Sequence, residues 1–250
     1  MKLLNKLTDE YLEDMLVRLS HNSSAIEGNT LSYNETVSIV LNRTIPSSNK
    51  NINIREFYEV ENHKYALGYI LEELRKNKPL DIYILKEINN KLMEHLNYNK
   101  GNFKTESNAI KGADFETSSP EKTPFLMYQW VNNLNYRLEN SFDEEEKTKI
   151  ILEEHINFER VHPFSDGNGR TGRMLMIYSA LQAEITPFII PVDKKNDYYT
   201  VLREQNVEKF YELVKPLKEF ELNRINKFFN KEKSSWKERI KTDKNLDMER

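Results

Sequence analysis

The chain has 250 residues, of which 38% are hydrophobic and 31% charged, and its formal net charge is −3. This length and composition are typical of one globular domain with an appended lobe. The slightly negative charge gives no general attraction to nucleic acid or to anionic membranes, so we predict neither as a partner. The sequence contains no cysteine, which excludes disulfide bonds and thiolate chemistry.

The N-terminal segment is not typical of a signal peptide, because it turns acidic early instead of continuing as an apolar run. No segment reaches the roughly 20 apolar residues that are needed to span a bilayer. We therefore expect a soluble, cytoplasmic protein that does not enter a membrane.

Apolar residues recur at helical spacing along most of the chain, which predicts an all-α fold. In chain order, these stripes lie in residues 12–19, 60–74, 85–96, 130–138, 151–162, 174–181 and 210–217. Pro216 falls in the last stripe, where we expect it to kink or divide the helix. Residues 101–122 lack the periodicity and are predicted to form a loop or a short hairpin. A loop of this length is often functional, although a mobile connector is the alternative.

Residues 162–173 read HPFSDGNGRTGR and are the most informative stretch of the chain. Gly167 and Gly169 permit a tight turn before a helix, and they let backbone N–H groups converge on an anion at the helix N-terminus. Arg170 and Arg173 are three residues apart, so both reach the same side of the first helical turn. The stretch therefore predicts a site for a polyphosphate.

Two further side chains have chemical roles beside such a site. Asp166 offers the hard oxygen ligand that Mg²⁺ requires. His162 has an ordinary pKa of about 6.5, so it can act as a neutral base. His155 lies on the same predicted helix face as His162 and is a candidate supporting residue. The alternative for the whole stretch is an ordinary corner between two helices with solvated charges.

These residues resemble the motif of the Fic (Fido) family, HxFx(D/E)GNGRxxR. Every fixed position is met, by His162, Phe164, Asp166, Gly167, Asn168, Gly169, Arg170 and Arg173. The resemblance covers roughly residues 20–205. It implies a mainly α Fic-fold core with a short β-hairpin flap. It also implies transfer of AMP from ATP to a Ser, Thr or Tyr hydroxyl of a target protein.

The resemblance also implies a role for each motif residue. His162 would deprotonate the attacking hydroxyl, and Asp166 would hold Mg²⁺ between the α- and β-phosphates. Asn168 and the amides of the two loop glycines would position the α-phosphate. Arg170 would bind the phosphates beyond it, and Arg173 would take the γ-phosphate.

The irregular segment from about residue 108 to residue 124 resembles the flap of this family, along which a target binds as an extended segment by strand addition. The candidate flap residues are Ala109, Ile110 and Lys111, and Tyr198 or Tyr199 is expected near the adenine. One position departs from the family pattern. Many members have arginine where this chain has Lys104, so a compact ammonium group replaces a planar guanidinium there.

A second motif precedes the first by more than a hundred residues. The sequence SSAIEG, residues 23–28, matches the inhibitory motif (S/T)xxxE(G/N) of the same family. Ser23 and Glu27 are four residues apart and share a helix face, and Gly28 is a helix stop signal. Ser32 and Glu35 then form a capping box that begins another helix. The resemblance implies that Glu27 pairs with Arg173. ATP could then still bind, but its α-phosphate would be turned away from in-line attack by the target hydroxyl.

On this basis, residues 1–50 are assigned to N-terminal helices that include the inhibitory one, 51–205 to the catalytic core, and 206–250 to a helical extension. Three alternatives stay open: a hydrolase that removes AMP with the same residues, a nucleotide-binding regulator without catalysis, and a homodimeric assembly. A DNA-binding role is disfavoured, because the chain has neither a clear winged-helix segment nor a net positive charge.

Overall fold

The computed structural model describes residues 3–45, 51–109 and 116–248, with side chains as far as Ser234. Within these ranges the regular elements are helices, as predicted, and an isolated β-bridge joins Phe103 to Phe164. The helices are α1 (Asp9–Ile26), α2 (Tyr33–Val40), α3 (Ile54–Arg75), α4 (Ile82–Leu92), α5 (Thr123–Glu139), α6 (Glu144–Val161), α7 (Asn168–Gln182), α8 (Lys195–Glu204) and α9 (Val207–Met248), with short 3-10 turns at Leu4–Lys6 and Val192–Lys194. No helix in the described ranges is both long and apolar enough to cross a bilayer.

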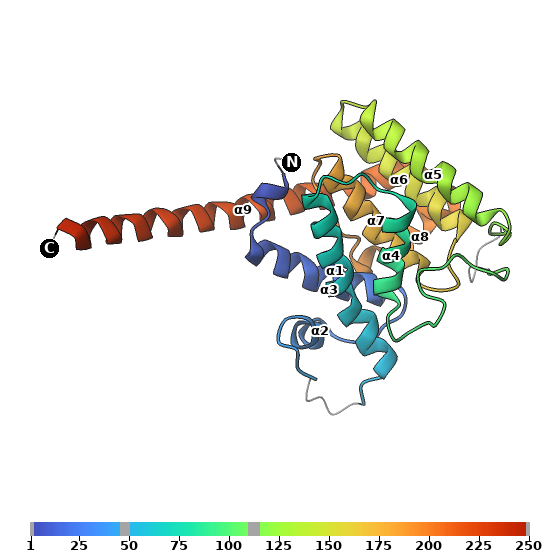
Figure 1. Ribbon diagram of the computed structural model, residues 1–250, viewed down its shortest axis with the longest axis horizontal. Coiled ribbons are helices and arrows are strands. Elements are labelled where there is room, and N and C mark those ends of the chain that lie inside the picture. The colour runs from blue at the N-terminus through green and yellow to red at the C-terminus, as the bar shows by residue number, and fades with distance from the viewer. Residues whose placement is uncertain (1–2, 46–50, 110–115, 249–250) are drawn as a thin grey trace.

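Helix α7 runs through the middle of the helical body, where α1, α3, α4 and α6 contact it (Figure 1). It is buried along nearly its whole length, because consecutive apolar residues such as Leu175, Met176 and Ile177 point in different directions around the helix and are all buried. The loop that follows α6 leads directly into the buried first turn of α7. Close packing of α7 therefore holds this loop in place.

The predicted end of the first long helix is confirmed. Helix α1 stops at Ile26, Glu27 is its C-cap residue, and Gly28 has φ +103°, a conformation that favours glycine. The predicted capping box is also present, because Glu35 N donates to Ser32 Oγ and Ser32 N donates to the Glu35 carboxylate. These local signals position the end of α1 and the start of α2.

Of the two effects expected of Pro216, a kink or a division of the C-terminal helix, the division is wrong, since α9 continues through it. A proline removes one helical hydrogen bond, but packing on either side can hold the helix together. Phe210 and Ile225 are fully buried on the two sides of Pro216. Tyr11 on α1 also donates a hydrogen bond of 2.9 Å to Glu221. Beyond this anchor the far end of α9 extends away from the body (Figure 1).

The expected β-hairpin flap is not seen in the part of the flap segment that the structure describes, residues 101–109 and 116–122. A two-stranded hairpin is marginal without further partners, which is the physical reason to find irregular chain here. The two sides of the segment nevertheless meet, because Thr117 Oγ1 donates to Asn108 O at 2.8 Å. Ala109 is exposed, whereas Ile110 and Lys111 lie outside the described residues.

Candidate active site

His162 follows the last residue of α6 in the left-handed conformation, with φ 50° and ψ 61°. Its Nδ1 lies 3.3 Å from Glu159 O, and because a carbonyl can only accept, Nδ1 is the donor. Nε2 is therefore the ring nitrogen left to accept a proton. Burial lowers the pKa of His162 to about 4, so the imidazole is neutral at pH 7.

The loop after His162 is closed by the Asn168 side chain. Asn168 Oδ1 accepts from Phe164 N at 2.9 Å, and Nδ2 donates to Phe164 O at 2.8 Å. Gly167 has φ 78°, and a Cβ there would collide with the sulfur of Met93. The side-chain amide of Asn168 thus holds the loop in its conformation. The backbone N–H of Asn168, in the first turn of α7, is therefore the group of this residue that is available to an anion.

Arg170 carries a buried guanidinium whose hydrogen-bonding capacity is only partly used. It is 3% exposed, and its Nε and Nη1 have no hydrogen-bond partner among the described residues. Glu59 and Asp166 lie nearby, with N–O distances of 3.8 and 3.7 Å. Burial lowers the pKa of Arg170, and these two carboxylates oppose the effect. Buried donors without partners indicate a place where an oxyanion would fit.

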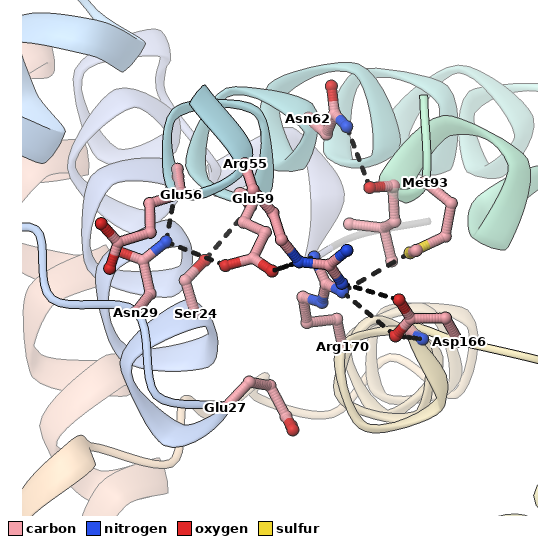
Figure 2. A network of polar contacts seen from close by, with 12 residues as sticks. Ser24, Glu27, Asn29, Arg55, Glu56, Glu59, Asn62, Met93, Asp166 and Arg170 are labelled. Carbon is pink, nitrogen blue, oxygen red and sulfur yellow. Dashed lines mark hydrogen bonds and ion pairs between the residues drawn. The ribbon is translucent and has the colours of Figure 1, made fainter. Parts of the chain in front are cut away.

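Asp166 lies against two cations, Arg55 from α3 and Arg170 from α7 (Figure 2). Arg55 Nη2 lies 2.7 Å from Asp166 Oδ2, and Gly167 N donates to Oδ1 at 2.6 Å. Mg²⁺ commonly binds one or two carboxylates together with substrate phosphates. The described residues contain no cluster of three potential metal ligands, so Asp166 fits this ion only where phosphate oxygens complete the site.

Glu27 and Arg173 are brought together, as the sequence predicts. Arg173 Nη2 donates to Glu27 Oε1 at 2.7 Å, and the same guanidinium donates to Ser23 Oγ and Ser23 O. A Cβ on Gly169 would collide with Glu27 Oε1, so the carboxylate lies directly against the first turn of α7. It occupies the position where a helix N-terminus would bind an anion.

Electrostatics favour this contact. Burial raises the pKa of Glu27, but the charge and hydrogen bond of Arg173 together with other nearby cations outweigh it, so that pKa lies below its usual range. Burial also lowers the pKa of Arg173, and the charge and hydrogen bond of Glu27 together with other nearby acidic groups more than reverse the effect. Both partners are therefore charged at neutral pH. The Glu27 side chain, 35% exposed, compensates the charge of Arg173, whose side chain is 3% exposed.

The two tyrosines expected near the adenine differ in exposure. Tyr198 is 1% exposed, and its hydroxyl lies 2.7 Å from Nε2 of His155. His155 therefore supports α8 rather than contacting His162. Tyr199 is 41% exposed and donates to Ile26 O, next to Glu27. Tyr199 is consequently the better placed of the two for a ligand.

Sequence reasoning missed several residues that position the loop. Asn89 on α4 donates to Asp166 O at 3.2 Å and to Thr171 Oγ1 at 3.1 Å. Arg55 and Glu59 on α3 contact the loop from another side. No motif marks these residues, since each acts through a contact between helices that are distant in sequence.

Lys104, the departure from the family pattern, connects the flap segment to the end of α6. Its Nζ donates to Val161 O at 3.0 Å, to Asn108 Oδ1 at 2.8 Å and to Thr117 Oγ1 at 3.1 Å. Burial lowers the pKa of Lys104 to about 8. Three separate acceptors suit the three donors of an ammonium group, so lysine is well matched to this position.

The fold and the loop together define a helical protein in which a glycine-containing turn connects a histidine to a buried helix N-terminus. The model of the Fic/DOC family matches residues 79–180, which include this turn. Residues 79–180 therefore form a Fic domain.

Relatives and solved structures agree with this assignment. The protein adenylyltransferase Fic of Aedes aegypti is 29% identical over 187 residues, 74% of this chain and 36% of that protein. Its counterpart in Drosophila grimshawi is 26% identical over 186 residues, 74% of this chain and 37% of that protein. This chain thus spans little more than a third of their length. A Fic domain containing signaling protein from Bacteroides thetaiotaomicron has the same fold, with a TM-score of 0.73, 21% identity, and 90% and 94% of the two chains covered.

Proposed function

We propose that this protein transfers AMP from ATP to a hydroxyl side chain of a target protein, and that Glu27 keeps the site inhibited. The observation that carries the proposal is the set of buried guanidinium donors of Arg170 and Arg173 around the first turn of α7, next to the neutral base His162. The names of the relatives above, protein adenylyltransferase Fic, also support it.

The chemistry follows from the roles of these groups. His162 Nε2 takes the proton of the attacking hydroxyl, whose oxygen forms a bond to the α-phosphorus. The bond from the α-phosphorus to the oxygen that bridges it to the β-phosphate breaks, and pyrophosphate leaves. The two arginines stabilise the negative charge of the departing group. Asp166 would hold Mg²⁺, which supplies further positive charge beside the phosphates.

Inhibition follows from the position of Glu27. Its carboxylate lies against Gly169 and pairs with Arg173. The guanidinium of Arg173 is therefore not available to bind the terminal phosphate of ATP. A displaced triphosphate directs its α-phosphorus away from His162, and a misplacement of about 1 Å can lower the rate roughly 100-fold. Movement of the end of α1 would restore the site.

The target would bind as an extended segment along the flap. Ala109 is exposed next to Asn108, whose Nδ2 donates to His162 O at 3.1 Å. The flap is thus tied to the backbone of the catalytic base. A target segment at this edge would present its hydroxyl close to His162.

The test is incorporation of labelled AMP from ATP and Mg²⁺ into the protein itself and into cell lysate. Glu27→Gly is expected to raise incorporation at least about tenfold, because it frees Arg173. Glu13→Gly is the matched control, since Glu13 is an exposed glutamate on the same helix. His162→Ala in the Glu27→Gly background should abolish the signal.

An unchanged signal in Glu27→Gly would refute the inhibitory role, and a signal that survives His162→Ala would refute the proposed chemistry. The same proteins incubated with an AMP-modified substrate distinguish the hydrolase alternative. Removal of AMP by the unmodified chain and its loss in Glu27→Gly would favour that alternative.

A further inference from the structure

Glu159 is a buried carboxyl beside the catalytic base that the proposed chemistry does not use. It lies on α6, one turn before His162, and is 8% exposed. Glu159 Oε2 is 3.8 Å from His162 Nδ1, and Oε1 is 4.0 Å from His155 Nε2. Oε1 has no hydrogen-bond partner among the described residues. The carboxyl group therefore lies between two imidazoles.

The packing leaves space for this group. A Cβ on Gly172 would be 2.7 Å from Glu159 Oε1, so glycine on α7 allows the carboxyl to fit beneath the helix. Burial of an incompletely paired carboxyl costs free energy, and an apolar side chain would fill the same space without that cost. Glu154 on the same helix shows the ordinary solution, an ion pair with Arg137 at 2.8 Å.

We propose that Glu159 is a positioning residue whose ionised carboxylate stabilises the imidazolium that His162 becomes when it takes the proton of the attacking hydroxyl. This inference rests on the proposed function. The carboxylate would attract the Nδ1–H side of the ring, which keeps Nε2 directed at the hydroxyl, as a carboxylate partner does for a catalytic histidine in other enzymes.

The surroundings connect the charge of Glu159 to the inhibitory contact. Burial raises its pKa to about 8, Arg173 opposes this rise, and Glu27 adds to it. The charged and titratable groups that act on Glu159 or respond to it are His155, His162, Arg173, Glu27, Tyr198 and Tyr199. The charges of Lys104, Glu27 and Asp166 also act on His162. Departure of Glu27 removes a negative charge and frees Arg173, and both changes favour the ionised carboxyl.

This coupling gives the inhibitory contact a second effect. While Glu159 is neutral, His162 keeps a pKa of about 4 and is a weak base. An ionised carboxylate at this distance raises the proton affinity of the imidazole toward the value that suits catalysis near neutral pH. Release of Glu27 would therefore open the phosphate site and strengthen the base together.

The experiment compares Glu159→Gln with Glu154→Gln, both in the full chain carrying Glu27→Gly. The kcat and the KM for ATP of AMP transfer are measured from about pH 6 to pH 9, and the imidazole of His162 is titrated by nitrogen NMR. Glu159→Gln should lower kcat about tenfold at pH 8, keep KM for ATP within about twofold, and abolish the rise of kcat with pH. The nitrogen shifts of His162 should follow the ionisation of Glu159 across this pH range in the parent and stay constant in Glu159→Gln, because His162, with a pKa of about 4, is neutral throughout the range.

Glu154→Gln should change neither the pH profile nor the His162 titration. If the titration of His162 is the same in Glu159→Gln and its parent, the inference is wrong, whether or not AMP is transferred. If Glu27→Gly transfers no AMP, the proposed function fails, and the NMR titration still decides the role of Glu159. Glu159→Met, which fills a similar volume without a charge, gives the same test if the glutamine variant does not fold.

Discussion

Two ion pairs cover the loop from opposite sides, and they have the same length but different surroundings. Arg173 meets Glu27 of α1 at 2.7 Å, and Asp166 meets Arg55 of α3 at 2.7 Å. The Arg173 side chain is 3% exposed, whereas that of Arg55 is 49% exposed. Water therefore screens the second pair and is nearly excluded from the arginine of the first.

The comparison shows that the N–O distance alone does not predict how much each ion pair contributes to stability. Exposed pairs typically contribute about 0–1 kcal/mol, so Arg55 can leave Asp166 at little cost when a metal or phosphate arrives. The two carboxylates are about equally exposed, 35% for Glu27 and 36% for Asp166, so the pairs differ in their arginines. Removal of Glu27 leaves the buried charge of Arg173 uncompensated, which is more costly. We therefore expect the Glu27–Arg173 pair to determine whether the site is inhibited, and the Arg55–Asp166 pair to separate easily when a ligand binds.

The largest expected effect is on nucleotide binding. In the Glu27→Gly background, Arg173→Ala should weaken ATP binding about 10- to 100-fold, because a charged hydrogen-bonding group is lost in a buried site. Isothermal calorimetry measures the affinity. Arg203→Ala, at an exposed position on α8, is the control. Equal affinities in the two variants would show that Arg173 does not bind the nucleotide.

The next effect is on stability without nucleotide. Glu27→Gln should lower the free energy of unfolding by roughly 1–3 kcal/mol, because buried Arg173 loses its charged partner. Urea denaturation measures the loss, and saturating ATP should reduce it, since a ligand of the native state stabilises that state. If Glu27→Gln is as stable as the parent, the Glu27–Arg173 pair contributes no more to stability than the exposed Arg55–Asp166 pair.

Low pH should remove the contribution of the Glu27–Arg173 pair to the free energy of unfolding. The pKa of Glu27 is lower in the folded protein than its ordinary value, so its pair with Arg173 stabilises the fold above the ordinary carboxyl pKa. That contribution disappears as the pH falls through the lowered value. The difference in unfolding free energy between the parent and Glu27→Gln should therefore shrink with acidification below about pH 4. A difference that stays constant down to pH 3 would contradict an ionic contact.

The smallest effect is expected for the exposed pair. Arg55→Ala should change the free energy of unfolding by no more than about 0.5 kcal/mol, as is usual for screened surface pairs. The same urea titration measures it beside Glu27→Gln. A loss as large as that of the buried pair would overturn the ranking by burial.

The all-α class, the capping box at Ser32 and the stop at Gly28 were predictable from sequence because each depends on residues within one or two helical turns. Pro216 shows the limit of such signals, since burial of Phe210 and Ile225 holds α9 together across it. The flap was predictable as an irregular segment, whereas its anchoring by Lys104 to Val161 depends on contacts between distant parts of the chain.

The sequence by itself determined which chemical groups the loop carries, because a histidine, a carboxylate, three glycines and two arginines lie within residues 162–173. Only the tertiary structure decided the state of these groups. Glu27 reaches Arg173 across 146 residues, and Arg55 and Glu159 approach the loop from α3 and α6. Burial and charge compensation depend on which helices pack together, and no local pattern encodes them.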